Sequence, residues 1–400
     1  MKKNFLLLVG VLCALCVGCS KPDIIEENVA NAEVQLSALL AASEEGGVVR
    51  IPSTYRDGAV KFVPQRDWVS GFFAGSLWRM YELTGDEKWA EAAQRHTENL
   101  HEIQYLTSHH DVGFIMGSSY GNGRRLKEIG GYDTVLVNTA KSLCTRYRPK
   151  AGVLQSWNAD KGWQAQRGWK CPVIIDNMMN LELLFWASQI SGNESFREVA
   201  ISHANQTLEH HYRGDFSTWH VVDYDPETGA VRGKCTAQGA ADESAWARGQ
   251  AWGLYGYVMA YRFTQNEAYL QRAEEVVKFL FSHPNMPADL VPYWDFNAPN
   301  IPNEPRDVSS ATIIASALYE LSDVMKNGEY KVLADKIIES LSSPAYRAAR
   351  GECGGFILKH SVGSIPHNSS IDVPLNYADY YFLEALVRKG NIEKGLPAVK

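Results

Sequence analysis

The sequence predicts an all-α protein in which helical hairpins close into a ring. Two observations indicate this fold: one turn signature recurs four times along the chain, and each turn separates two helices of different character. Each turn combines a helix stop, an N-cap residue and an early glutamate that suits the positive end of a helix. The four glutamates are Glu87, Glu194, Glu267 and Glu329.

The helix before each turn differs from the helix after it. The later helices are amphipathic, as Trp89, Ala92, Ala93 and His96 show with their i, i+3, i+4, i+7 spacing. The earlier helices are apolar on nearly all sides, which predicts burial on both faces. These apolar helices run from Trp68 to Leu83, Met178 to Ile190, Trp252 to Phe263, Val308 to Leu321 and Tyr377 to Val387.

The alternation favours a closed ring, with one degenerate hairpin between the first two turns. If the inner helices run parallel, their N-termini meet at one rim, where converging helix dipoles suit an anionic ligand. Polar clusters fall at those N-termini: Trp68-Val69-Ser70-Gly71, Asp176-Asn177, Trp246-Ala247-Arg248-Gly249-Gln250, Asp307-Val308-Ser309-Ser310 and Asn376-Tyr377-Ala378-Asp379. We expect one pocket to collect them; the alternative is an open α-solenoid used for binding.

One segment interrupts the helical pattern. Residues 220–229 carry β-branched side chains that lead into a Pro and Gly turn, and this pattern predicts a β-hairpin on the rim. Its acidic residues lack the full spacing of a calcium loop, so a turn is the interpretation we adopt.

The N-terminus is typical of an exported protein. Lys2 and Lys3 precede an apolar stretch from Phe5 to Val17, and Gly18-Cys19 matches the cleavage site of a bacterial lipoprotein apart from Cys16, where an aliphatic residue is usual. We expect 1–19 to be a lipoprotein signal ending at the acylated Cys19, 20–30 a tether, and 31–400 one catalytic domain. This predicts a periplasmic or outer-membrane lipoprotein, with ordinary secretion into the periplasm as the alternative.

Composition limits the partners. The net charge of −7 and the lack of any Lys or Arg run longer than two residues argue against nucleic acid. The remaining cysteines are scattered without the Cys and His pairing of a zinc site, so we expect neither a metal nor another cofactor. They are Cys144, Cys171, Cys235 and Cys353. No obligate protein partner is evident, and we expect membrane contact only through the lipid anchor.

Two carboxylates are candidates for acid and base chemistry. Asp176 lies between an apolar approach and an apolar helix, where desolvation raises a carboxyl pKa, although an N-cap role is equally open. Asp111 comes just before the inner helix that precedes the one at Asp176, so ring geometry predicts that the two carboxylates lie side by side. The alternative is that Asp111 only makes a hydrogen bond within its loop. Two neighbouring carboxyl groups shift each other's pKa values apart, so one can be protonated while the other is ionised.

Arg248 and Trp252 are four residues apart and share a helix face. A guanidinium binds a carboxylate in a bidentate manner and an indole stacks on a sugar ring, so this pair suits an acidic sugar. The alternative is an internal cation–π pair.

Several ordered motifs resemble one enzyme family over essentially the whole mature chain. The sequence is similar to the unsaturated glucuronyl hydrolases of glycoside hydrolase family 88 in Trp68-Val69-Ser70-Gly71-Phe72-Phe73-Ala74-Gly75, His110-Asp111-Val112-Gly113-Phe114, Ile175-Asp176-Asn177-Met178-Met179-Asn180-Leu181, Trp219-His220-Val221-Val222, and the stretch from Gln238 to Trp252. Ala74, Glu243 and Ala247 depart from common family residues, which affects the expected substrate preference more than the chemistry.

The resemblance implies an (α/α)₆ barrel, a toroid of six helical hairpins, with Asp176 as general acid and base and Asp111 as the second essential carboxylate. It also implies substrate contacts from Trp68, His220, Gln238, Trp246, Arg248 and Trp252. The implied activity releases 4,5-unsaturated uronic acid from the non-reducing ends of glycosaminoglycan-type oligosaccharides by hydration of the C4=C5 bond. Alternatives are an unsaturated rhamnogalacturonyl hydrolase on pectin fragments, an inverting glucanase on the same barrel, and a non-catalytic glycan-binding lipoprotein.

Overall fold

The computed structural model describes residues 23–399. The predicted signal segment and Cys19 lie outside the described residues. The predicted tether at 20–30 is wrong from Asp23 onward, because Asp23 caps helix α1 (Ile24–Ser43) and this helix belongs to the barrel wall. Asn28 on α1 donates a hydrogen bond to Ser342, near the opposite end of the sequence. The folded domain therefore starts before residue 31.

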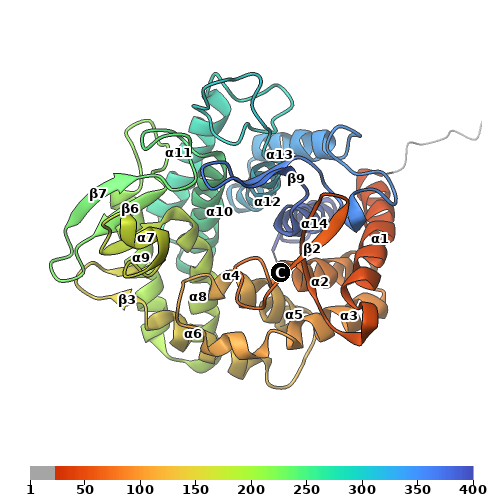
Figure 1. Ribbon diagram of the computed structural model, residues 1–400, viewed down its shortest axis with the longest axis horizontal. Coiled ribbons are helices and arrows are strands. Elements are labelled where there is room, and N and C mark those ends of the chain that lie inside the picture. The colour runs from red at the N-terminus through yellow and green to blue at the C-terminus, as the bar shows by residue number, and fades with distance from the viewer. Residues whose placement is uncertain (1–22, 400) are drawn as a thin grey trace, which may run out of the picture.

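Within residues 23–399, twelve helical segments form two concentric layers (Figure 1). The outer helices are α1, α3 (Glu87–Glu98), α6 (Tyr132–Cys144), α9 (Glu194–His210), α11 (Glu267–Ser282) and α13 (Gly328–Leu341). The inner helices are α2 (Phe72–Thr84), α8 (Leu181–Ser191), α10 (Ala247–Thr264), α12 (Val308–Met325), α14 (Asn376–Glu393) and an interrupted rod described below. Contacts run from α2 through the rod, α8, α10, α12 and α14 back to α2, so the ring is closed as predicted.

Local capping explains the four repeated turns. At each of these four turns the inner helix ends at a residue with left-handed backbone, and an Asp or Asn then caps the outer helix through its side chain. The caps are Asp86, Asn193, Asn266 and Asn327, and each accepts a hydrogen bond from the backbone N–H two residues later. The predicted alternation of fully buried and amphipathic helices is confirmed; α12, for example, is buried at every position from Val308 to Ser322.

The degenerate hairpin has a different inner element. Its rod comprises α4 (Val112–Met116), one π-helical turn η3 (Gly117–Gly121) and α5 (Asn122–Leu126). A π turn adds a residue to the helical repeat and is common near functional sites. Gly131, with φ of 90°, then starts α6, so this hairpin lacks the repeated turn signature.

Small sheets and short helices are attached to the barrel. The predicted hairpin is confirmed as β6 (Val221–Tyr224) and β7 (Val231–Cys235), and β5 (Cys171–Ile174) pairs with β6. Sequence patterns did not predict β1 (Ile51–Arg56) with β2 (Ala59–Val63), nor β8 (Ser361–Ser364) with β9 (Ser369–Val373). The remaining elements are β3 (Tyr147–Arg148), β4 (Val153–Leu154), α7 (Gly162–Gln166), η1 (Glu45–Gly47), η2 (His101–Tyr105), η4 (Ile175–Asn180) and η5 (Cys353–Gly355).

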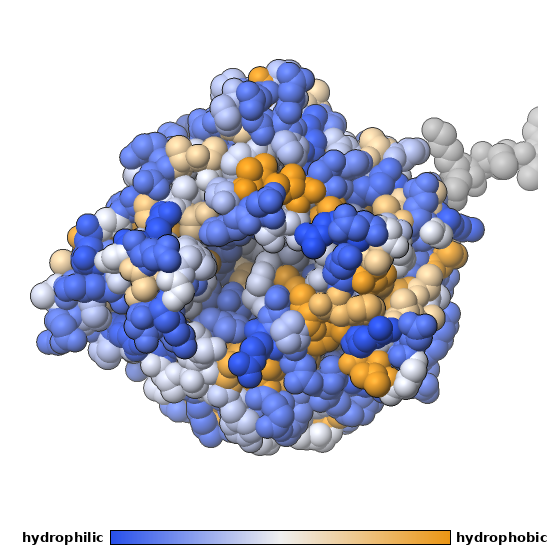
Figure 2. Space-filling view, viewed as in Figure 1, coloured by the Kyte–Doolittle hydropathy of each residue, from blue (hydrophilic) through white to orange (hydrophobic). Residues whose placement is uncertain are grey.

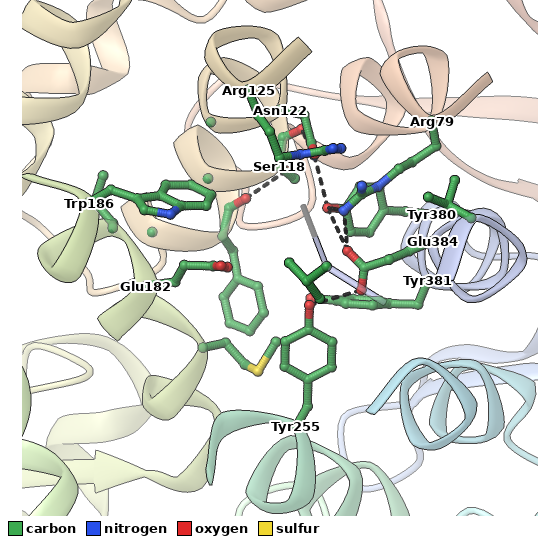
Figure 3. A pocket seen from close by; sticks show the side chains of 18 of the residues that line it. Arg79, Ser118, Asn122, Arg125, Glu182, Trp186, Tyr255, Tyr380, Tyr381 and Glu384 are labelled. Carbon is green, nitrogen blue, oxygen red and sulfur yellow. Dashed lines mark hydrogen bonds and ion pairs between the residues drawn. The ribbon is translucent and has the colours of Figure 1, made fainter. Parts of the chain in front are cut away.

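An alternating chain of arginines and glutamates links neighbouring inner helices around the ring. We call these eight residues the ion-pair belt: Arg125, Glu82, Arg79, Glu384, Arg388, Glu320, Arg262 and Glu182, each paired with the next. The belt surrounds a cavity of about 190 Å³ on the barrel axis, and Figure 3 shows several of its members around that space. The inner helices are thus joined by charge pairs as well as by apolar contacts.

Within residues 23–399, no helix is long and apolar enough to span a bilayer. The four cysteines of this part of the chain are free thiols.

Candidate active site

The sequence-predicted site residues converge at the rim formed by the N-termini of the inner helices. Asp111 precedes α4, Asp176 lies in η4, and Arg248 and Trp252 lie on the first turns of α10. His220 precedes β6, Gln238 follows β7, Trp246 precedes α10 and Trp68 precedes α2. The view of Figure 2, which is that of Figure 1, shows a face of the molecule that is hollowed near its middle.

Asp176 is a buried carboxyl group with a free oxygen. Its side chain makes no helix-capping hydrogen bond, so the N-cap interpretation is wrong; instead the residue lies in the first turn of the 3₁₀ helix η4. Its Oδ2 atom is buried without a hydrogen-bond partner among the described residues and lies 3.7 Å from Nε2 of His220. The pKa of Asp176 is raised to about 7, mainly by burial; the charge of Arg248 opposes the rise and the charge of Asp111 adds to it.

His220 presents an N–H group toward Asp176. Its Nδ1 accepts hydrogen bonds from the backbone N–H groups of Ala237 (3.0 Å) and Gln238 (3.2 Å). Since Nδ1 is an acceptor, the ring proton belongs on Nε2, the atom that faces Asp176. Burial, together with the charge of Arg248, keeps the pKa of His220 far below its usual value, so the ring is neutral.

Asp111 has the opposite electrostatic environment. Its two carboxylate oxygens lie 3.1 Å from Nδ1 of His109 and 3.3 Å from Nε2 of His110. Burial alone would raise its pKa, but His110, His109 and Arg146 together lower it below the usual value. The predicted separation of the two pKa values is therefore present. Near neutral pH, Asp111 is ionised while Asp176 is half protonated.

Arg248 is engaged within the protein. Its guanidinium donates to Asp307 (3.2 Å) and to the carbonyls of Val362 and Gly363, the latter at 2.6 Å. The same group lies over the Trp246 ring, 4.5 Å from its centroid, so an internal cation–π contact exists, with Trp246 rather than Trp252. Gln238 also donates to the Gly363 carbonyl (3.3 Å). Both side chains thus fix strand β8 across the rim.

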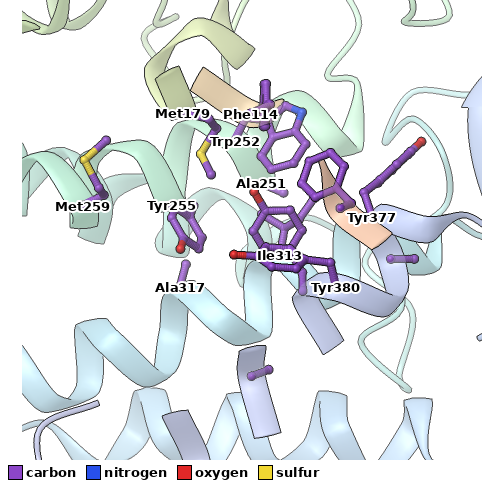
Figure 4. Packing of buried hydrophobic residues seen from close by; sticks show 14 of the residues in the cluster. Phe114, Met179, Ala251, Trp252, Tyr255, Met259, Ile313, Ala317, Tyr377 and Tyr380 are labelled. Atoms are coloured by element: carbon purple, nitrogen blue, oxygen red, sulfur yellow. The ribbon is translucent and has the colours of Figure 1, made fainter. Parts of the chain in front are cut away.

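Aromatic rings form the floor of the site (Figure 4). Phe114 lies between Trp68 and Trp252, with ring centroids 5.5 and 5.1 Å away. Trp68 also packs against Tyr377 at 4.9 Å. Phe114 also lines the axial cavity of Figure 3, so this floor lies between the candidate site and the cavity.

Sequence reasoning missed some residues that support the site. Asp307 is fully buried and holds Arg248, while the Trp157 ring lies 6.1 Å from that of His220. Asn180 and His110 form buried contacts behind Asp111. Asn180 and His110 lie within the motifs that resemble the family, and Asp307 lies in one of the polar clusters at the helix N-termini, so their positions in the sequence could have identified them. No sequence pattern marked Trp157. Within the described range, no group of three or more His, Cys, Asp or Glu is arranged to hold a metal ion.

Comparisons with known proteins identify one family. The model of Glycosyl Hydrolase Family 88 matches residues 46–319. An unsaturated glucuronyl hydrolase of Formosa agariphila is 46% identical over 331 residues, covering 82% of each chain. One from Bacillus sp. strain GL1 is 34% identical and covers 85% of this chain and 90% of the relative.

Solved structures give the same result. An unsaturated glucuronyl hydrolase specific for heparin superposes with a TM-score of 0.88 and 43% identity, covering 94% of this chain and all of the other. The Bacillus sp. GL1 enzyme superposes with a TM-score of 0.83 and 29% identity, covering 93% and 98%. The fold is therefore the (α/α)₆ barrel of these enzymes, and the chain belongs to glycoside hydrolase family 88.

Proposed function

We propose that this hydrolase removes 4,5-unsaturated uronic acid from the non-reducing ends of glycosaminoglycan-derived oligosaccharides. The observation that carries the proposal is Asp176, a buried carboxyl with a free oxygen and a pKa of about 7, beside the ionised Asp111. The names of relatives support the substrate class, since they include unsaturated chondroitin disaccharide hydrolases at about 30% identity. Pectin-derived substrates remain the second candidate to be assayed.

The proposed reaction is a hydration in which one carboxyl performs both proton steps. Protonated Asp176 donates its proton to C4 of the double bond, and a cation of oxocarbenium type develops at C5. The resulting Asp176 carboxylate then accepts a proton from the water that adds to C5. The hemiketal formed in this way opens and releases the neighbouring sugar as an alcohol. A carboxyl that is half protonated at neutral pH suits this cycle, because it must act first as an acid and then as a base.

Neighbouring residues have separate roles in the proposal. The Asp111 carboxylate stabilises the cation at C5, and the Nε2–H of His220 donates to a substrate oxygen near Asp176. Trp68, Trp246 and Trp252 supply ring surfaces for the sugar, and Gln238 contributes a polar contact. Since both terminal nitrogens of Arg248 already bond to the protein, its main contribution is positive charge near the uronate and a fixed strand β8.

An absorbance assay tests the function. The conjugated enoate of an unsaturated uronic acid absorbs in the near ultraviolet, and hydration removes that absorbance. We expect loss of absorbance with unsaturated disaccharides from chondroitin, hyaluronan or heparin, and slower loss with an unsaturated rhamnogalacturonan disaccharide. Faster turnover of the pectin product would favour the rhamnogalacturonyl alternative. Unchanged absorbance with every substrate would refute the proposed activity.

Replacing Asp111 by Asn should change the pH dependence of the enzyme. The charge of Asp111 raises the pKa of Asp176, so its removal lowers that pKa. Because Asp176 must be protonated to donate a proton to C4, the alkaline limb of kcat/KM should move to lower pH, by roughly half a unit to one unit. A profile of kcat/KM between pH 4 and 9 measures this shift. An alkaline limb at unchanged or higher pH would show that Asp111 does not act on Asp176 through its charge.

We also propose that the protein is a lipoprotein anchored through Cys19. The support is the sequence pattern of Lys2, Lys3, the apolar stretch and Gly18-Cys19. In the full-length chain, Cys19→Ser should move the protein from the membrane fraction to the periplasmic fraction, whereas Cys13→Ser, within the signal, should leave it in the membrane fraction. Recovery of the Cys19→Ser protein in membranes would contradict the anchor.

A further inference from the structure

Asn180 is a fully buried amide behind the catalytic rim. It is the last residue of η4, the short helix whose second residue is Asp176. Its Oδ1 accepts a hydrogen bond from the Phe114 backbone N–H at 2.9 Å. Its Nδ2 lies 3.2 Å from Asn177 Oδ1 and 3.2 Å from His110 Nδ1. Every hydrogen-bonding atom of the amide therefore has a partner inside the protein.

These contacts fix which way the amide points. A backbone N–H can only donate, so the atom of Asn180 that faces Phe114 must be the oxygen. The NH₂ group then faces Asn177 and His110. Asn177 is fixed in the same way, since its own NH₂ donates to the Leu154 carbonyl at 2.8 Å, which leaves its oxygen as the acceptor. The orientation of Asn180 is set by two backbone groups.

The orientation of Asn180 determines the tautomer of His110. Because Asn180 donates to Nδ1 of this imidazole, Nδ1 has no proton and the ring proton is on Nε2. Nε2 lies 3.3 Å from the nearer Asp111 oxygen. His110 is fully buried, and burial lowers its pKa, so the ring is neutral and offers one N–H. Nε2 makes no hydrogen bond among the described residues, so its N–H is a free positive dipole end beside Asp111.

Close backbone packing holds this arrangement in place. A side-chain carbon added to Gly113 would lie 2.5 Å from the Cα of Asn180, so η4 and α4 approach as nearly as two backbones can. One end of η4 carries Asp176, and the other end contacts the residues that flank Asp111. A single short helix thus connects the surroundings of both carboxylates.

We propose that Asn180 is a positioning residue that holds His110 as its Nε2–H tautomer, and that this N–H keeps the Asp111 carboxylate ionised and oriented toward the substrate. The expected effect of this inference on catalysis rests on the proposed function. The arrangement of the side chains does not depend on the substrate. Loss of the N–H would remove a positive dipole end 3.3 Å from the buried Asp111, where a less stabilised carboxylate takes up a proton more readily.

Other charged groups also face the two carboxylates and must stay unchanged in a test. Asp111 is influenced by His109 and Arg146 as well as by His110, and it interacts with Asp67. Asp176 is influenced by Arg248 and Asp111 and lies beside His220, with Tyr377 also in range. Substitution of His110 removes only His110 from this set of groups, and Asn180→Asp adds one carboxyl to it.

Two substitutions at His110 isolate the N–H. Asn places a polar atom near the Nδ1 position only, whereas Gln places an amide N–H near the Nε2 position. We expect His110→Asn to lower kcat by about 10²-fold with KM within roughly threefold, as misplacement of a catalytic group does. The acid limb of its kcat/KM profile should move to higher pH. His110→Gln should recover most of the loss and restore the limb. Equal activity or equal loss in both folded variants, with an unshifted acid limb, would overturn the inference.

A spectroscopic measurement gives an answer that does not depend on turnover. In protein labelled with ¹⁵N-histidine, the ring nitrogens of His110, assigned by their absence in His110→Gln, should show the Nε2–H tautomer. Asn180→Asp replaces the donor by an acceptor, so the proton should move to Nδ1 or the ring should become charged. An Nδ1–H tautomer in the wild type would overturn the inference. If the wild type hydrates no unsaturated uronoside, the proposed function fails while the tautomer result stands separately.

Discussion

Replacing Asp176 by Asn should lower kcat by about 10³ to 10⁴-fold, because the side chain performs both proton transfers and each acid or base role contributes roughly 10²–10⁴-fold. Asn has nearly the same shape, so KM should change little. The assay is loss of enoate absorbance at saturating substrate. The melting temperature of the variant should stay at or above that of the wild type, since a neutral amide removes the cost of a buried ionisable group.

A second carboxyl provides a matched control. Asp379, on the first turn of α14, is equally buried, and burial likewise raises its pKa to about 7. Its oxygens accept hydrogen bonds from the backbone N–H groups of Ile357 and Leu358, so it holds a loop and has no free oxygen. Asp379→Asn should lose stability while kcat remains within about tenfold of the wild type. Loss of kcat at Asp379 but not at Asp176 would contradict the assignment.

Replacing Glu384 by Gln should destabilise the barrel by about 3–5 kcal/mol, the usual effect of removing one partner of a buried ion pair. Glu384 is the centre of the ion-pair belt: it pairs with Arg79 and Arg388 and accepts hydrogen bonds from Tyr255 (2.9 Å) and Ser316 (2.7 Å). Without its charge, the two buried guanidinium groups lose a shared counterion. Urea unfolding of both proteins, fitted with the same dependence of the unfolding free energy on urea concentration, measures the difference in stability.

The stabilising contribution of Glu384 should depend on pH. Despite burial, the neighbouring arginines lower the pKa of Glu384 from 4.5 to about 2. Its stabilising contribution is therefore complete above pH 4.5 and is lost as the pH falls toward 2. The stability difference between wild type and Glu384→Gln should shrink over that range. As a control, Asp133→Asn breaks an exposed pair with Arg124 and should cost at most about 1 kcal/mol. Equal effects of the two substitutions would contradict a structural role for the belt.

The helical ring was predictable because its signals are local. The cap residues Asp86, Asn193, Asn266 and Asn327 each bond two residues along the chain, so their pattern is visible in a short window. The strand pair β8 and β9 was not predictable, because its short segments lack a strong alternation. Its attachment to the rim comes from Arg248, which reaches Gly363 at a separation of 115 residues.

The same distinction applies to the site. Ring geometry predicted that Asp111 and Asp176 would be neighbours, since both precede inner helices. Sequence spacing could not reveal that Asp176 lies in the first turn of a 3₁₀ helix instead of capping an α-helix, nor that Arg248 is occupied by Asp307 and two carbonyls. Those properties depend on contacts between segments that are distant in the sequence.

The most direct test of the proposed chemistry is the position of deuterium in the product formed in D₂O. If Asp176 protonates C4, an unsaturated disaccharide should yield a keto-uronic acid with one deuteron added at C4, and early time points should show a single stereoisomer. In the same reaction time, Asp176→Asn should form product and label about 10³ to 10⁴-fold more slowly. Release of the neighbouring sugar while the enoate persists, with no deuterium at C4, would show hydrolysis at the anomeric carbon and contradict the account.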